Sequence, residues 1–172
     1  TVTSDSTNVL LTWCDSHVAL SLGGVSLIGR RAEFTYFKFR EMIPSDIGVR
    51  VKAATASMAQ AIRRVLPFAK TNDTKTSRAL RFTFEPSRLT VAAESSDRGA
   101  SSDTVKIEYE SDEILVGYDS RYIGEAVDAV HSAEVELTMD AKHGQDGPTV
   151  VRPVDSELPF KALHIVMPMR LG

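Results

Sequence analysis

The stretch VRVKAATASMAQAIRRVLPFA, residues 49–69, passes from a strand pattern to a helix pattern with no loop between them. Val49 and Val51 alternate with polar residues, which predicts a short strand with one apolar face. Apolar residues then recur at helical spacing, which predicts an amphipathic helix over 55–69. The apolar face of this helix consists of Met58, Ile62, Val65 and Leu66.

The same order recurs 65 residues later, in ILVGYDSRYIGEAVDAVHS, residues 114–132. It predicts a strand over 114–118 and a helix over 119–132 that Asp119 or Ser120 caps. We expect Tyr122, Ile123, Ala126, Val127 and Val130 to face inward. The shift places Met58, Ile62 and Val65 on Ile123, Val127 and Val130.

Proline and loop residues set the expected boundaries. Pro67 lacks a backbone N–H and clashes with the preceding helical turn, so the first helix should end near Leu66. Ser, Asp and Gly dominate 95–102, which predicts a polar loop. Three strands should follow each helix, at 79–85, 88–94 and 103–110 and at 134–139, 148–154 and 162–168.

These elements form a β-α-β-β-β unit that occurs twice. Any two amphipathic helices can be aligned, but here the whole order of elements repeats. We therefore predict an α+β fold with two helices packed on antiparallel sheet. Ahead of the first unit, β-rich runs predict strands at 8–13, 17–22, 25–28 and 32–39, followed by a linker over 40–48.

Composition limits the classes of function. The chain has 172 residues, of which 42% are hydrophobic, and a net charge of −3, which disfavours tight electrostatic DNA binding. Its single cysteine, Cys14, excludes an internal disulfide. No apolar run approaches the ~20 residues that span a bilayer, so we expect no membrane partner.

No sequence motif indicates catalytic chemistry. The four histidines are scattered, and neither a phosphate-binding loop nor a nucleophile elbow is present. We expect a binding or scaffold protein that is not an enzyme and that needs no metal or cofactor.

The chain ends in HIVMPMRLG, residues 164–172, an apolar run with two methionines and a proline. One interpretation is a last core strand with a frayed end. The other is a surface for several partners, because flexible methionine side chains adapt to different ligands.

The quoted residues resemble the bacterial DNA polymerase III beta sliding clamp family. VMPMRL is a characteristic ending of that family, ILVGYDSRYIGEAVDAV resembles its IxFNxxYLxDAL strand and helix, and FKFREMIP resembles the FPxYxxxIP segment between its middle and last domains. The resemblance implies that 1–43 is the C-terminal part of a middle clamp domain and 44–172 the complete last domain. We expect a fragment of a longer clamp, with a shortened homologue as the alternative.

The resemblance implies a processivity factor that encircles duplex DNA without sequence preference. Its partners would be the DNA polymerase III alpha subunit, the clamp loader and repair polymerases, bound through short peptide motifs. A full-length chain would close a head-to-tail homodimer ring in the cytoplasm, associated with the nucleoid. The alternative is a truncated clamp-like adaptor or decoy that binds partner peptides without forming a ring.

The family's functional residues transfer position by position. Phe37 stands where proline is usual, and Glu41 falls where some clamps have arginine. DNA-facing residues would be Arg63, Arg64 and Arg121, and dimer-interface residues Pro67, Phe68, Asp97 and Asp103. The implied partner-peptide pocket consists of Phe37, Met42, Pro148, Thr149, Ile165, Val166, Met167, Pro168, Met169, Arg170 and Leu171.

Overall fold

The computed structural model describes residues 8–32, 35–36, 38–44, 47–69, 78–96, 98–140, 146–155 and 162–171. The chain divides into two compact units, Thr1–Lys38 and Phe39–Gly172. Each unit is considered by itself. In the described ranges no helix is long and apolar enough to cross a membrane.

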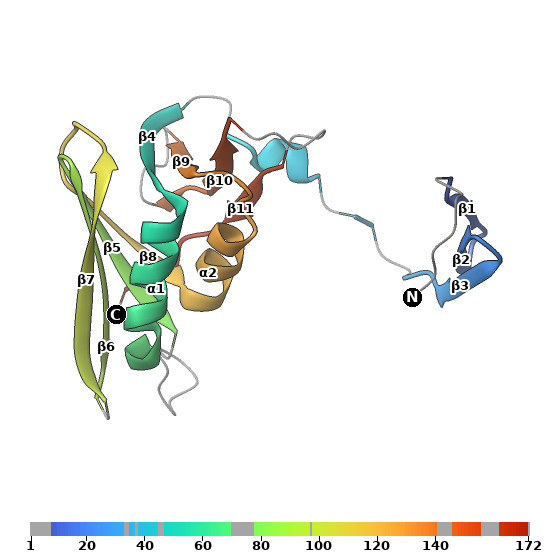
Figure 1. Ribbon diagram of the computed structural model, residues 1–172, viewed down its shortest axis with the longest axis horizontal. Coiled ribbons are helices and arrows are strands. Elements are labelled where there is room, and N and C mark those ends of the chain that lie inside the picture. Colours follow the sequence, from blue (N-terminus) through green and yellow to red (C-terminus); the bar gives the residue numbers. More distant parts are fainter. Residues whose placement is uncertain are drawn as a thin grey trace. The chain divides into compact units, whose positions relative to one another are not determined.

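The first unit is an antiparallel meander of three strands, β1 (Leu10–Trp13), β2 (His17–Leu22) and β3 (Val25–Arg30), which lie side by side in sequence order (Figure 1). Gly23 and Gly24 make the second turn with φ values of 55° and 81°, a conformation that glycine adopts without strain. The register places Leu11 opposite Leu20 and Leu20 opposite Leu27. One face of the meander is therefore apolar.

The strand expected over 32–39 is wrong where the structure describes it. Ala32, Thr35, Tyr36 and Lys38 lie in no strand, and Phe39–Met42 form a short 3-10 helix, η1. Alternation of side chains predicts a strand only where a neighbouring strand supplies hydrogen bonds, and none of the described strands pairs with this stretch. The expected linker over 40–48 likewise contains most of η1 and the start of the next strand.

The second unit contains the predicted duplication. The first half runs β4 (Ile47–Ala54), α1 (Thr55–Ala69), β5 (Ala79–Glu85), β6 (Arg88–Ser95) and β7 (Gly99–Glu108). The second half runs β8 (Ile114–Asp119), α2 (Ser120–Asp128), β9 (Glu134–Asp140), β10 (Thr149–Val154) and β11 (His164–Val166). The predicted α+β fold of two β-α-β-β-β units is confirmed.

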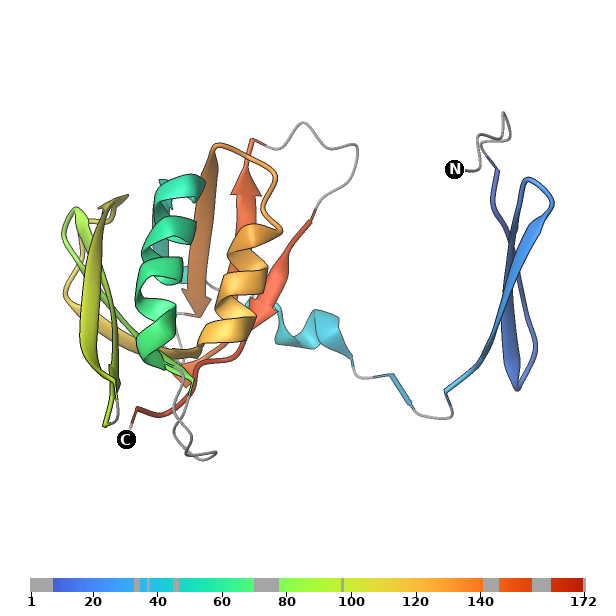
Figure 2. The same ribbon diagram turned by 60° about the horizontal axis from the view of Figure 1, so that its bottom comes forward.

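The strand order of this sheet reflects the duplication. Its eight strands lie in the order β11-β10-β9-β4-β7-β6-β5-β8, so β11-β10-β9-β4 corresponds strand by strand to β7-β6-β5-β8. The two helices lie side by side on the inner face of the strands (Figure 2). The residues related by the shift of 65 are all buried in one core: Met58, Ile62, Val65, Ile123, Val127 and Val130.

The C-terminal ends of both helices differ from the predictions. The first helix continues through Pro67 to Ala69, because a proline in the last turn removes only a bond near the helix end. The second helix begins after the predicted cap Asp119, whose side chain accepts from the Arg121 N–H, but it ends at Asp128. Because this helix has only nine residues, its buried face is a narrow stripe.

Tyr122 falls outside that stripe. Its side chain is 53% exposed, and the Arg121 guanidinium lies 4.6 Å from the centre of its ring. The inward position predicted for Tyr122 is wrong.

The polar loop predicted over 95–102 is also wrong. β6 and β7 pair up to Ser95 opposite Gly99, so most of this segment belongs to a long hairpin. Gly99 has a φ of 82°, which lets the chain turn there. Of the polar residues in this segment, Ser102 is exposed, whereas Ser95 is buried.

Candidate partner-binding surface

The C-terminal segment begins as a core strand and ends as a surface. Val166 in β11 pairs with Thr149 in β10 and is buried in the core. The next residue, Met167, is 51% exposed. Pro168, Met169 and Leu171 are half-buried, and Arg170 is exposed. Side chains along one short segment therefore alternate between anchoring the chain and facing solvent.

A backbone bridge to β8 holds this segment. The Met169 N–H donates to the Gly117 carbonyl at 2.8 Å, and the two residues form an antiparallel bridge. The segment after β11 therefore pairs with β8 along the edge that faces away from β5. The shift of 65 relates Gly117 to Lys52 in β4, which pairs with Glu108 in β7.

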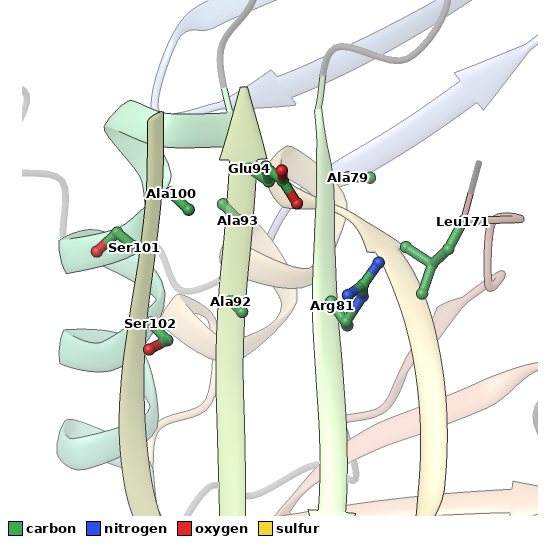
Figure 3. Close-up of a pocket in the computed structure, with 9 residues that line it drawn as sticks. All are labelled: Ala79, Arg81, Ala92, Ala93, Glu94, Ala100, Ser101, Ser102 and Leu171. Atoms are coloured by element: carbon green, nitrogen blue, oxygen red, sulfur yellow. The ribbon is translucent and has the colours of Figure 1, made fainter. Parts of the chain in front are cut away.

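The Leu171 side chain also lines a shallow concavity of about 430 Å³ on the outer face of β5, β6 and β7 (Figure 3). Small side chains form its floor, with the charged side chains of Arg81 and Glu94 also in its lining. Of the predicted pocket residues that the structure describes, only Leu171 lines it. The described residues that line it are Ala79, Arg81, Ala92, Ala93, Glu94, Ala100, Ser101, Ser102 and Leu171.

Thr149 lies behind the segment rather than on it. It is 1% exposed, and its hydroxyl is 2.7 Å from the hydroxyl of Tyr118. Burial raises the pKa of Tyr118 far above its usual value, and the hydrogen bond from Thr149 offsets this only in part. The Tyr118 hydroxyl therefore stays protonated, and its hydrogen bond with Thr149 links β8 to β10 inside the protein.

The remaining pocket residues come from two places. Ile165 pairs with Val150 and points to the face opposite Val166, and Pro148 leads into β10 half-buried. Met42 and Glu41 are exposed at the end of η1, which lies beside the β10–β11 edge in both views (Figures 1 and 2). Phe37 lies outside the described residues.

An ionic cluster that the sequence analysis missed lies on the strands β4, β9 and β10. The Glu136 carboxylate is almost buried, accepts from Arg50 Nη1 at 3.1 Å and from Arg152 Nε at 2.6 Å, and also pairs with Arg152 Nη2. Both arginines are partly exposed, so the cluster presents cationic groups to solvent. A single glutamate between valine and leucine gave no sequence signal of it.

The predicted DNA-facing arginines lie on the outer sides of the helices, and all three have partners. Arg63 Nη2 donates to Asp128 Oδ1 at 2.6 Å, across from α1 to α2. Arg64 Nη1 donates to Asp103 Oδ2 at 3.0 Å. Arg121 stacks on Tyr122, as described above. Since each cation is exposed, these pairs are weakly held.

The predicted interface residues gather at the end of α1. Pro67 is exposed, Phe68 is half-buried against the core, and Asp103 is engaged by Arg64. Arg98 Nη1 donates to the Pro67 carbonyl at 3.2 Å, which ties the β6–β7 hairpin to the helix end. Asp97 lies outside the described residues.

Known proteins share this architecture. Residues 40–170 match the family described as the DNA polymerase III beta subunit, C-terminal domain. The chain is 22% identical over 151 residues to the beta sliding clamp of Synechococcus elongatus, covering 87% of this chain and 38% of that protein. It is 26% identical over 140 residues to that of Streptomyces coelicolor, covering 78% and 35%.

Solved structures agree on the fold. The sliding clamp from Pseudomonas aeruginosa superposes with a TM-score of 0.82 at 15% identity, covering 95% of this chain and 42% of that one. The Bartonella birtlesii clamp bound to griselimycin gives a TM-score of 0.80 at 21% identity, covering 95% and 41%. The chain therefore spans well under half the length of the relatives it matches.

Proposed function

Because the chain belongs to the DNA polymerase III beta subunit family, whose C-terminal domain it matches, we propose that it works as part of a DNA sliding clamp. It acts without catalysis, in the cytoplasm and associated with the nucleoid, as a tether that keeps replication proteins on DNA. Residues 1–43 are proposed to be the end of the middle clamp domain and 44–172 the last domain.

This proposal rests on the C-terminal segment, which the bridge between Met169 and Gly117 holds against β8. Met167 is 51% exposed and stands between the buried Val166 and the bridged Met169, so its apolar side chain is held at the surface where a partner can bury it. A segment whose backbone is already held in place loses little backbone entropy on binding. Partner peptides of the polymerase, clamp loader and repair polymerases are proposed to dock here with apolar side chains.

DNA is proposed to be held by encirclement rather than by tight phosphate contacts. The net charge of −3 and the carboxylate partners of Arg63 and Arg64 both reduce the attraction to phosphate. The ring itself requires a head-to-tail homodimer of the longer protein, with the end of α1 and the β6–β7 hairpin as this domain's contribution.

A fluorescence-polarisation titration with a clamp-recognition peptide tests the proposal. Met167→Ala should weaken binding about five- to thirtyfold, as expected for an apolar anchor. Leu115→Ala is the matched control, because Leu115 is exposed to a similar degree on β8 but lies outside the proposed pocket. The Bartonella protein binds griselimycin, so this compound should compete with the peptide here. Absence of any binding to the unaltered chain, in its full-length form, would contradict the proposal.

A further inference from the structure

Gly117 in β8 differs from Gly24, Gly29, Gly99 and Gly124 in how closely the rest of the chain approaches it. A Cβ at position 117 would lie 2.5 Å from the Met169 carbonyl oxygen and 2.8 Å from Leu171 Cδ2. Non-bonded carbon atoms are most favourable at about 3.5–4.0 Å, so neither distance is tolerable. At Gly24, Gly29 and Gly99 a Cβ would meet nothing within 4 Å.

Backbone conformation does not explain the glycine. The positive φ angles among the described glycines occur at Gly23, Gly24 and Gly99, and Gly117 has an ordinary strand conformation. Glycine within a strand weakens it unless another part of the chain needs the space. At this position the space is filled by the C-terminal segment.

The equivalent position in the first half of the domain shows what differs. Lys52 occupies it, and its neighbour Glu108 is part of a regular strand that stays in the sheet. In the second half β11 ends at Val166, and the tail makes a single bridge before Leu171 reaches the lining of the concavity that also includes Arg81. Arg81 pairs with Gly117 from the other side. The tail therefore lies against β8 at Gly117, with the Leu171 side chain on its outer side.

We propose that Gly117 is the positioning residue of the C-terminal segment. Its missing side chain lets Met169–Leu171 lie against β8, and this contact fixes Met167 and Pro168, which stand directly before it. The effect on partner binding rests on the proposed function, whereas the seating of the tail does not. Any side chain at position 117 displaces the Met169 carbonyl and Leu171 together.

The first test measures the tail directly. In Gly117→Ala, hydrogen exchange of the Met169 amide should accelerate at least about tenfold, because its hydrogen bond to the Gly117 carbonyl is lost. The matched control is Gly124→Ala in α2, where a Cβ would meet Ile62 Cγ2 at an acceptable 3.8 Å. Unchanged exchange at Met169 in Gly117→Ala would overturn the proposal.

A double-mutant cycle locates the conflict. Gly117→Ala alone should lower Tm by at least about 5 °C. In a Leu171→Ala background the added loss should be smaller, because two of the three closest atoms belong to the Leu171 side chain. If Gly117→Ala lowers Tm equally in both backgrounds, the damage lies inside β8, and the positioning role of Gly117 is refuted.

Peptide titration separates this inference from the proposed function. If the unaltered chain binds the peptide, Gly117→Ala should weaken binding at least about fivefold while Gly124→Ala leaves it unchanged. Equal peptide affinity in Gly117→Ala would overturn the positioning role at the partner surface. If the unaltered chain binds no peptide, the proposed function fails, and the exchange and Tm results still decide where the tail is seated.

Discussion

The chain contains two antiparallel meanders of the same design, β1–β2–β3 and β9–β10–β11, and their apolar faces have opposite environments. Leu27 on the first is 67% exposed, whereas Leu137 on the second is fully buried. The second meander is covered by helices that pack on its inner face, as Figure 2 shows. Among the described residues of its own unit, the first meander has no helix to cover it. Alternation of apolar and polar residues therefore creates an apolar face, and this face becomes buried only where helices pack on it.

Leucine truncation in the two meanders should give the largest contrast. Leu137→Ala removes buried methyl groups and leaves a cavity, so it should lower the free energy of unfolding by about 2–5 kcal/mol. Leu27→Ala should change it by less than about 0.5 kcal/mol. Urea unfolding followed by far-UV circular dichroism measures both. A loss for Leu27→Ala as large as that for Leu137→Ala would show that the first face is covered in solution.

The sequence predicted the second meander and its cover because helical spacing is a strong signal. Met58, Ile62 and Val65 and their counterparts 65 residues on each contribute to one core, so the repeat follows from the pattern alone. Tyr122 was misassigned because the same spacing cannot tell how wide a stripe a nine-residue helix buries. The β6–β7 hairpin was missed because its outer residues are as polar as a loop.

The candidate surface was predictable only through resemblance. Nothing in the local pattern of Met167 and Met169 shows that one is exposed and the other bridged to β8, because that depends on Gly117, which lies 52 residues earlier in the chain than Met169. Gly117 carried a usable signal, since a glycine inside a strand pattern indicates close approach. The ionic cluster around Glu136 joins three strands, and no local spacing reports such a contact.

A smaller effect should come from the buried hydroxyl pair that supports the covered meander. Tyr118→Phe leaves the Thr149 hydroxyl without this partner and should cost about 1 kcal/mol. Adding Thr149→Val should restore part of that loss, because no unsatisfied polar group then remains. Thermal unfolding of the single and double variants measures the coupling. Additive losses would show that the pair contributes no joint stabilisation.

The same pair gives a dependence on pH. Burial raises the pKa of Tyr118 in the folded state, so its contribution to stability is complete below the unfolded pKa of about 10. Above that value the unfolded chain ionises first, and stability falls as pH rises. Tyr118→Phe should flatten this alkaline slope and leave the share of Tyr109, whose pKa burial also raises. An unchanged slope would show that Tyr118 is accessible to solvent.

The smallest effect should come from the ion pair on the solvent-exposed side of α1 and α2. Arg63 and Asp128 join α1 to α2 at 2.6 Å, but their side chains are 66% and 50% exposed. An exposed ion pair loses most of its Coulomb energy to solvent and to the entropy of holding two flexible side chains. Arg63→Ala should therefore lower the free energy of unfolding by no more than about 0.5 kcal/mol, with less effect at 1 M salt than at low salt. Urea unfolding at both salt concentrations measures it, with Arg88→Ala as the control for an exposed arginine paired within one hairpin. A loss above about 1 kcal/mol that persists at high salt would show that the helices are held together from outside, and would contradict the assignment of the cover's stability to its buried face.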